Sequence, residues 1–300
     1  MGRGRDLGES AVPVQSRGTP TKMPTNTQPC QRWRNKRDSY RPAGELIQPD
    51  RYNVAELRGD AVAKAFVTHH HYSATYPSAR FRFGMFEGEK LVGVAVFSHP
   101  VSNKVLTNVF GGDALESVEL GRFVLLDEVP SNGETWFLAK CRRALKSQGL
   151  RGIVSFSDPV ARETEDGEQV FPGHIGTIYQ ASNAAYLGRA TGRTLHLLPS
   201  GRVFSARAQS KIRNNERGSH YAVEQLVAAG APVTTQPDAE WLDIAMERVT
   251  RKLRHPGNHR YAWVLNGPKL TQLSQRYPKF STRGNSDLFD FMAAQRGTIS

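Results

Sequence analysis

The chain has 300 residues, a net charge of +12 at pH 7 and 38% hydrophobic residues, enough for one or two globular domains. Two cysteines, Cys30 and Cys141, are too few for a disulfide framework or a cysteine-based zinc site. The apolar runs are too short to span a bilayer, and the N-terminus lacks the apolar segment of a signal peptide. These features predict a soluble protein of a reducing cytoplasm with no membrane partner.

The positive charge is distributed unevenly along the chain. Residues 1–45 carry nine Lys/Arg against four Asp/Glu (+5), residues 46–199 carry sixteen of each (0), and residues 200–300 carry fifteen against eight (+7). A neutral body with basic flanks is typical of a protein whose body holds the chemistry and whose flanks bind a polyanion. The alternative is that the charge serves solubility or nonspecific RNA binding.

Residues 1–45 are rich in Gly, Pro, Thr, Gln and Arg and lack apolar periodicity, which predicts a disordered basic arm. The next elements predicted in chain order are a helix at 54–66, a hairpin of strands at 81–86 and 90–97, a strand at 118–126, a helix at 134–148 and a strand at 152–156. An acidic surface loop at 162–169, a helix at 177–187, a strand at 193–198, helices at 210–230 and 238–253 and a short strand at 261–265 follow. This order predicts an α/β fold with a central sheet. We expect a core at 46–200, a basic DNA-binding part of the same domain at 201–265 and a tail at 266–300.

The segment after the strand at 152–156 combines an acid, a histidine and tyrosines. Asp158 stands beside Pro159 just past the strand end, and His174, Tyr179 and Tyr186 follow. Ligands of open α/β sheets bind where strands end, so Asp158, His174 and Tyr179 are candidate metal ligands or an acid/base set. The alternative is that Asp158 caps a turn.

Two other features are candidates for the same site. Arg122 lies inside an apolar strand, where an arginine must be paired or face a cleft, unless the strand lies at an edge and the side chain points to water. The run His69-His70-His71-Tyr72 ends a predicted helix, and one or two of these imidazoles can ligate a metal. The same histidines can instead complement the helix dipole.

The turn before the helix at 134–148 is a candidate anion site. Asn132, Gly133 and Thr135 lie between a strand and a helix N-terminus, where exposed amides can bind a pyrophosphate. An ordinary strand–helix connection has the same residues, and neither a Walker lysine nor a Gly-x-Gly-x-x-Gly motif is present.

Basic residues interleaved with aromatics form the strongest charge signal beyond residue 200. Such a pattern suits phosphate neutralisation and base stacking, and the alternative is a solvated helix face. The candidate DNA-binding residues are Arg207, Lys211, Arg213, Arg217, Arg251, Lys252 and Arg254.

Taken in order, these motifs resemble the Mom family of phage DNA-modification proteins over about residues 46–265. The resemblance rests on His71-Tyr72, on Glu119-Leu120-Gly121-Arg122-Phe123, on Ser157-Asp158-Pro159, on His174-x-Gly-Thr-Ile-Tyr179-Gln-Ala with Tyr186-Leu187-Gly188, and on the basic segment from Lys211 to Gly218.

The resemblance implies a GNAT-like acyltransferase fold with a central mixed sheet flanked by helices, here with a basic C-terminal helical extension. It implies a phage-encoded enzyme of the bacterial cytoplasm that adds a carbamoylmethyl (acetamido) group to N6 of a flipped adenine in double-stranded DNA and so blocks host restriction. It further implies catalytic roles for Asp158, Tyr179, Tyr72 and Arg122, an iron site for which His71, Asp158 and His174 are the candidate ligands, and acetyl-CoA as a possible donor. The usual GNAT pyrophosphate signature is missing before residue 134, which argues against ordinary use of acetyl-CoA.

Two other functions are consistent with the same residues. One is an N-acetyltransferase acting on a protein or small-molecule amine, and the other is a noncatalytic DNA-binding antirestriction protein in which His71 and Asp158 are structural. The sequence leaves the donor, the DNA sequence preference and the oligomeric state open.

Overall fold

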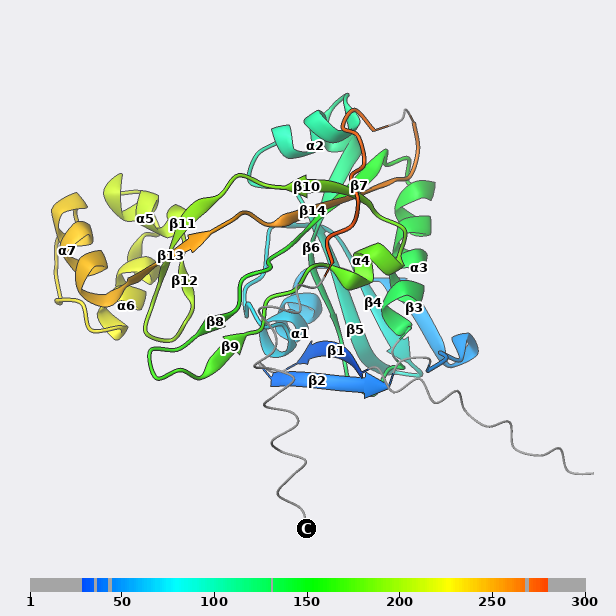
Figure 1. Ribbon diagram of the computed structural model, residues 1–300, viewed down its shortest axis with the longest axis horizontal. Coiled ribbons are helices and arrows are strands. Elements are labelled where there is room, and N and C mark those ends of the chain that lie inside the picture. The colour runs from blue at the N-terminus through cyan, green and yellow to red at the C-terminus, as the bar shows by residue number, and fades with distance from the viewer. Residues whose placement is uncertain (1–28, 35–36, 43–44, 131, 268–269, 280–300) are drawn as a thin grey trace, which may run out of the picture.

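The computed structural model describes residues 29–34, 37–42, 45–130, 132–267 and 270–279. Its centre is a seven-stranded sheet in the order β10-β14-β7-β6-β5-β4-β3 (Figure 1). The strands are β3 (Tyr52–Glu56), β4 (Ala79–Glu87), β5 (Lys90–Ser98), β6 (Ser117–Leu125), β7 (Gly152–Ser157), β10 (Ala185–Arg189) and β14 (His259–Val264). Only β6 and β7 are parallel, and the other neighbours are antiparallel. The predicted mixed sheet flanked by helices is confirmed.

Helices cover both faces of this sheet because its strands bury alternate residues on opposite sides. On β7, Ile153 packs into the cluster that contains Phe137 of α3 (Gly133–Ser147), whereas Val154 packs with Val109 of α2 (Lys104–Phe110). The helix α1 (Ala61–His70) packs on the same face as α2, and α4 (Thr177–Ala181) lies on the α3 face. The sheet is therefore buried on both sides, and functional side chains must emerge at its strand ends. Two 3-10 turns, η1 (Pro49–Arg51) and η2 (Ala114–Glu116), complete this part.

The parallel pair β6–β7 separates towards its carboxyl ends. Its ladder runs from Ser117 opposite Gly152 to Leu120 opposite Ser155 and stops there. Farther along, β6 pairs only with β5, whereas β7 continues with β14 as far as Ser157 opposite His259. The ends of the two strands thus leave a gap in the hydrogen-bond ladder, which other segments fill.

The basic helical part is an insertion between β10 and β14 rather than a C-terminal extension. It contains β11 (Arg193–Leu197), β12 (Val203–Phe204), α5 (Ala206–Arg213), α6 (His220–Ala228), α7 (Ala239–Val249) and β13 (Arg251–His255). Its strands form a separate sheet, β12-β11-β13, and its helices enclose a core of their own around Phe204, Leu226 and Leu242. The insertion projects from one end of the central sheet (Figure 1). The chain then returns to the central sheet through β14. The boundary expected at residue 200 therefore falls inside the insertion and does not separate the insertion from the central sheet.

Three segments differ from the expected loops and tails. The acidic loop forms a hairpin, β8 (Arg162–Glu163) with β9 (Gln169–Phe171), which touches the insertion through Glu165 N–H to the Pro199 carbonyl. Within the arm expected to be disordered, β1 (Pro29–Arg34) pairs with β2 (Arg37–Pro42), and the remainder of that arm lies outside the described residues. Residues 270–279 lie along β10, where Gln275 N–H donates to the Tyr186 carbonyl, and 280–300 lie outside the described residues.

Several helix predictions were too long. Residues 52–56 are strand β3, and α1 begins only at Ala61 after Gly59, which has a φ of +70°. The helix predicted at 210–230 is two helices, because Asn215 and Gly218 both adopt positive φ between them. The helix predicted at 238–253 ends at Val249, where β13 takes over. Within the described residues, no helix combines the length and apolar character that crossing a membrane requires.

Candidate functional site

The structure brings together the six side chains that the sequence singles out, and it does so in the gap between β6 and β7. His71 and Tyr72 follow α1, Arg122 lies on β6, and Asp158 follows β7. The last two, His174 and Tyr179, come from the loop and helix after the β8–β9 hairpin. The ring of Tyr72 lies 4.2 Å from that of His71 and 6.4 Å from that of His174. Segments far apart in the sequence therefore meet at one strand end.

Asp158 is the charged acid of this group. One carboxylate oxygen pairs with Arg162 at 2.9 Å, and the other accepts from His255 Nε2 at 2.8 Å and from Val160 N–H at 3.0 Å. Burial alone would raise its pKa, but the charge of Arg162 and the hydrogen bonds from His255 and Val160 outweigh burial and lower it. Asp158 is thus ionised at neutral pH, and it also closes the turn that the alternative interpretation expected.

The two histidines of the site are neutral. Burial lowers the pKa of His174 to about 4, although Asp158 opposes the shift. Burial, with the charge of Arg122, lowers the pKa of His71 well below its usual value. Because the backbone N–H of Ser73 donates to His71 Nδ1 at 3.1 Å, the proton of that ring lies on Nε2.

Among the residues that the structure describes, Arg122 is a cation held only by neutral oxygens. Its guanidinium donates to the Thr75 carbonyl at 2.8 Å, to Thr75 Oγ1 at 2.6 Å and to the Gly121 carbonyl at 2.6 Å. No carboxylate lies within ion-pair distance of it among the described residues, and β6 is an inner strand, so the edge-strand alternative does not hold. Its charge therefore remains available to an anionic or electron-rich ligand.

The two tyrosines retain their phenolic protons. Tyr72 stacks on Phe171 with 4.4 Å between ring centroids, and burial raises its pKa. Tyr179 packs against Tyr261 and Trp263, and burial raises its pKa although a hydrogen bond with Ser155 opposes the shift. Both phenols can therefore donate a hydrogen bond, and neither is a base at neutral pH.

A model of the Mom protein family matches residues 51–279 of the sequence. The chain belongs to the Mom protein family. The match spans all six site residues and the basic insertion, and no curated protein matches the chain.

Solved structures similar to this Mom family member include three acetyltransferase-type proteins. The tandem GNAT protein from the clavulanic acid biosynthesis pathway is 9% identical, with a TM-score of 0.38 over 73% of this chain and 100% of that one. A Bacillus subtilis acetyltransferase in complex with CoA is 9% identical, with a TM-score of 0.30 over 71% and 97%. The ribosomal-protein-S18-alanine N-acetyltransferase from Escherichia coli is 10% identical, with a TM-score of 0.31 over 76% and 99%.

The candidate iron ligands do not form a metal site in this Mom family member. Among the residues that the structure describes, no three His, Cys, Asp or Glu side chains are grouped so that they can hold a metal ion. The carboxylate of Asp158 is taken up by Arg162 and His255, and Nδ1 of His71 accepts from Ser73. His71, Asp158 and His174 lie in one site but do not fit a metal in this arrangement.

The candidate pyrophosphate residues at the start of α3 are engaged by the protein itself. Asn132 Oδ1 accepts the Ile47 N–H at 2.7 Å, and Thr135 Oγ1 donates to the Asn132 carbonyl. The Cα of Gly133 packs against Val129, since a Cβ there would lie 2.5 Å from a methyl of Val129. A buried acid, Glu134, occupies the first turn of α3. The side chains of Asn132 and Thr135 are therefore not free to bind a pyrophosphate.

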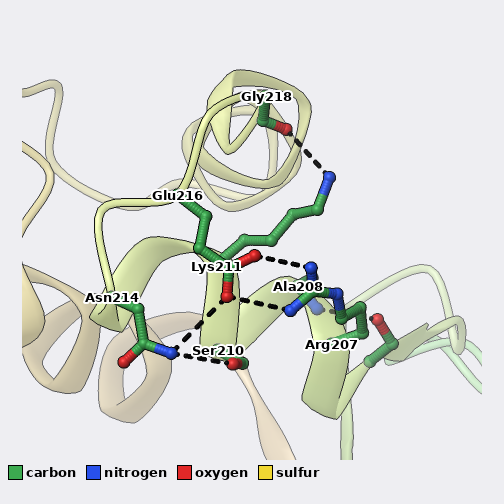
Figure 2. Close-up of polar contacts among 8 residues, drawn as sticks. Arg207, Ala208, Ser210, Lys211, Asn214, Glu216 and Gly218 are labelled. Carbon is green, nitrogen blue, oxygen red and sulfur yellow. Dashed lines mark hydrogen bonds and ion pairs between the residues drawn. The ribbon is translucent and has the colours of Figure 1, made fainter.

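Four of the seven candidate DNA-binding residues in the insertion have partners within the protein. Arg207 forms a bidentate ion pair with Glu216, and Lys211 donates to the Gly218 carbonyl (Figure 2). Arg213 pairs with Asp243. A further residue, Arg251, donates to the Glu163 carbonyl.

Other cations of the insertion project into solvent. Arg217, Lys252 and Arg254 are exposed and make no ion pair with another described residue. Lys252 and Arg254 lie on one face of β13, opposite His196 and Thr194 of β11. Of the seven candidates, these three are the ones whose side chains make no ion pair or hydrogen bond with another described residue and so remain available to phosphates.

Two further residues belong to the site, Glu119 and His255, and neither was predicted as a site residue from the sequence. Glu119 is a partly buried acid on β6 whose pKa burial raises to about 7, although the charge of Arg122 opposes the shift. His255 is fully buried and contacts Asp158 across 97 residues of sequence. The only sequence signal for Glu119 was its place three residues before Arg122 in the strand motif. No local sequence pattern links His255 to Asp158.

Proposed function

We propose that the protein is a transferase that modifies adenine in double-stranded DNA, replacing one N6 hydrogen with a carbamoylmethyl group and so protecting phage DNA from restriction in the bacterial host. The observation that carries the proposal is membership of the Mom family across residues 51–279. The convergence of Tyr72, Arg122, Asp158 and Tyr179, which come from four separate segments, supports it.

The chemistry of the site suits an exocyclic amine. N6 attacks the methylene carbon of a donor in which the carbamoylmethyl group is bound to a leaving group, so the new C–N bond forms as the bond from that carbon to the leaving group breaks. An ionised carboxylate such as Asp158 can orient the amine and accept the proton that N6 loses. The phenol of Tyr179 keeps its proton and can donate it to a departing group. Arg122 can hold an electron-rich oxygen of the donor, since its charge is not neutralised by a carboxylate.

The target base must leave the duplex before it can reach these groups, because N6 of a paired adenine is not accessible to a pocket. In the proposal, Arg217, Lys252 and Arg254 contact phosphates of the flanking duplex. No step of the proposed reaction runs through iron or acetyl-CoA, because the residues expected to hold them are engaged elsewhere.

The test is mass spectrometry of nucleosides from plasmid DNA that replicates in cells expressing the full chain. We expect an adenosine enlarged by the carbamoylmethyl group, and resistance of that DNA to a restriction enzyme that reads adenine. Asp158→Asn and Arg122→Gln should abolish both effects. Asp243→Asn and Arg80→Gln are matched controls, since Asp243 pairs at the surface of the insertion and Arg80, like Arg122, donates to backbone carbonyls.

Unmodified DNA from cells with folded wild-type protein would overturn the proposal. Acetylation of a protein or small-molecule amine in the same cells would point to an N-acetyltransferase instead. Restriction resistance without a modified nucleoside, unaffected by Asp158→Asn, would point to a noncatalytic DNA-binding protein.

A further inference from the structure

His255 connects the insertion to the candidate catalytic acid. It is the last residue of β13 and is fully buried, and its Nε2 lies 2.8 Å from Oδ1 of Asp158. Asp158 belongs to the end of β7, in the central sheet. The hydrogen bond between His255 and Asp158 therefore connects the small sheet of the insertion to the central sheet. Among the described residues, His255 is the only residue of the insertion whose side chain contacts the Asp158 carboxylate.

The tautomer of His255 is fixed by its other ring nitrogen. Gly257 N–H donates to Nδ1 at 3.0 Å, so Nδ1 is an acceptor and the ring proton lies on Nε2, facing Asp158. Gly257 has a φ of +96°, and a Cβ there would lie 1.9 Å from the carbonyl oxygen of Ala190. The turn that orients the imidazole is thus locked against the connection between β10 and β11.

Two hydrogen-bonding partners then fix the orientation of the carboxylate. The guanidinium of Arg162 donates to Oδ2 of Asp158, and Nε2 of His255 donates to Oδ1. The strand that ends in His255 also carries the exposed cations Lys252 and Arg254. One strand therefore presents positive charge to solvent at two positions and a hydrogen-bond donor to the site at a third.

We infer that His255 is a positioning residue, which donates through Nε2 to hold the Asp158 carboxylate towards the target adenine and which ties that carboxylate to the strand that contacts the flanking duplex. The inference rests on the proposed function, in which Asp158 acts on the adenine amine. His255 itself does not touch the base. Its predicted effect is on turnover rather than on DNA affinity, because Lys252 and Arg254 stay in place when the imidazole is replaced.

The experiment compares His255→Gln with His255→Met in the full chain. The two side chains have the same length, but only glutamine retains an N–H donor that can reach Asp158. We expect kcat to fall by about 100-fold in His255→Met, with most of that loss recovered in His255→Gln and KM for duplex DNA unchanged in both. His196→Met is the matched control, since His196 lies on the same small sheet but contacts Thr250 rather than Asp158, and it should retain wild-type kcat.

Thermal unfolding of each variant separates positioning from folding. Equal losses of kcat in His255→Gln and His255→Met, an unchanged kcat in His255→Met, or a loss confined to KM would overturn the inference. A folded wild-type protein that leaves DNA unmodified would instead refute the proposed function. In that case ¹⁵N NMR still reports on the contact: a His255 Nε2–H resonance that shifts in Asp158→Asn supports the positioning contact, and an unshifted resonance refutes it.

Discussion

The backbone N–H of His174 donates to the carbonyl of Asp158 at 2.7 Å, so the two residues lie side by side although the β8–β9 hairpin separates them in sequence. The hairpin folds outwards against the insertion and leaves its two ends together. Gly173, which precedes His174, has a φ of +73°, and a Cβ there would lie 2.7 Å from the carbonyl oxygen of Pro159. This close approach is what permits the chain to close on Asp158.

Gly173→Ala should therefore separate His174 from Asp158 and abolish DNA modification. Gly167→Ala is the matched control, because Gly167 also has a positive φ (+83°) but no heavy atom within 4 Å of the added Cβ. We expect Gly167→Ala to cost roughly 1–2 kcal/mol of unfolding free energy from backbone strain alone, and Gly173→Ala about 3 kcal/mol. Urea unfolding and nucleoside analysis measure the two effects. Equal stability and activity of the two variants would contradict the role of the Pro159 contact.

Local sequence patterns were sufficient for elements whose partners are near in sequence. The β4–β5 hairpin follows from alternating apolar residues around Gly88, and α3 follows from the helical spacing of Phe137, Leu138, Cys141 and Leu145, all of which are buried. These signals depend on neighbours within a few residues, so sequence alone contains them.

Elements stabilised by distant partners were not predictable in the same way. The segment 177–187 was predicted as one helix, yet α4 ends at Ala181, Asn183 adopts a φ of +59°, and β10 follows. The strand conformation of β10 depends on β14, where Tyr186 lies opposite Tyr261. The pairing of His255 with Asp158 depends on contacts of the same long range. The motifs named residues that the fold brings together, and only the fold shows what holds them.

The site should make the protein less stable in mild acid. Burial lowers the pKa of His174 to about 4, below the ordinary histidine value, so the unfolded chain binds a proton between about pH 6.5 and 4 that the folded chain does not. Stability is therefore full above about pH 6.5 and falls as pH decreases through this window, by about 2 kcal/mol from His174 between pH 6.5 and 5. When the free energy of unfolding in urea is plotted against pH, the slope between pH 6.5 and 5 should be shallower for His174→Gln than for wild type. An unchanged slope would contradict a buried neutral imidazole.

Arg162 should keep the pKa of Asp158 low, so that Asp158 stays ionised in mild acid. Burial raises the pKa of Asp158, and the charge of Arg162 is the largest of the influences that lower it. A group with a lowered pKa stabilises the fold above its unfolded pKa, near 3.9, and that contribution is lost as pH falls through the folded pKa. In Arg162→Met the pKa of Asp158 should rise towards its unfolded value, so the carboxylate stabilises the fold less above about pH 3.9 and the midpoint of acid unfolding should lie at a higher pH than in wild type. Acid unfolding followed by circular dichroism measures the midpoint. Arg207→Met is the control, since Arg207 pairs with Glu216 at the surface, and a shift as large in this variant would contradict a specific effect at Asp158.

The exposed cations of β13 should contribute to DNA binding, whereas the paired cations of α5 should not. Lys252 and Arg254 have no ion-pair partner among the described residues, but Arg207 and Arg213 are held by Glu216 and Asp243. A cation that neutralises one phosphate of duplex DNA adds about 0.9 to the magnitude of the slope of log K against log salt, so the double substitution of Lys252 and Arg254 by glutamine should reduce that magnitude by about 2. Duplex binding measured by fluorescence anisotropy at several salt concentrations tests this. The matched double substitution of Arg207 and Arg213 by glutamine removes the same charge and should change the slope less. Equal slopes in the two double variants would mean that β13 does not bind the phosphates and that net charge alone drives binding.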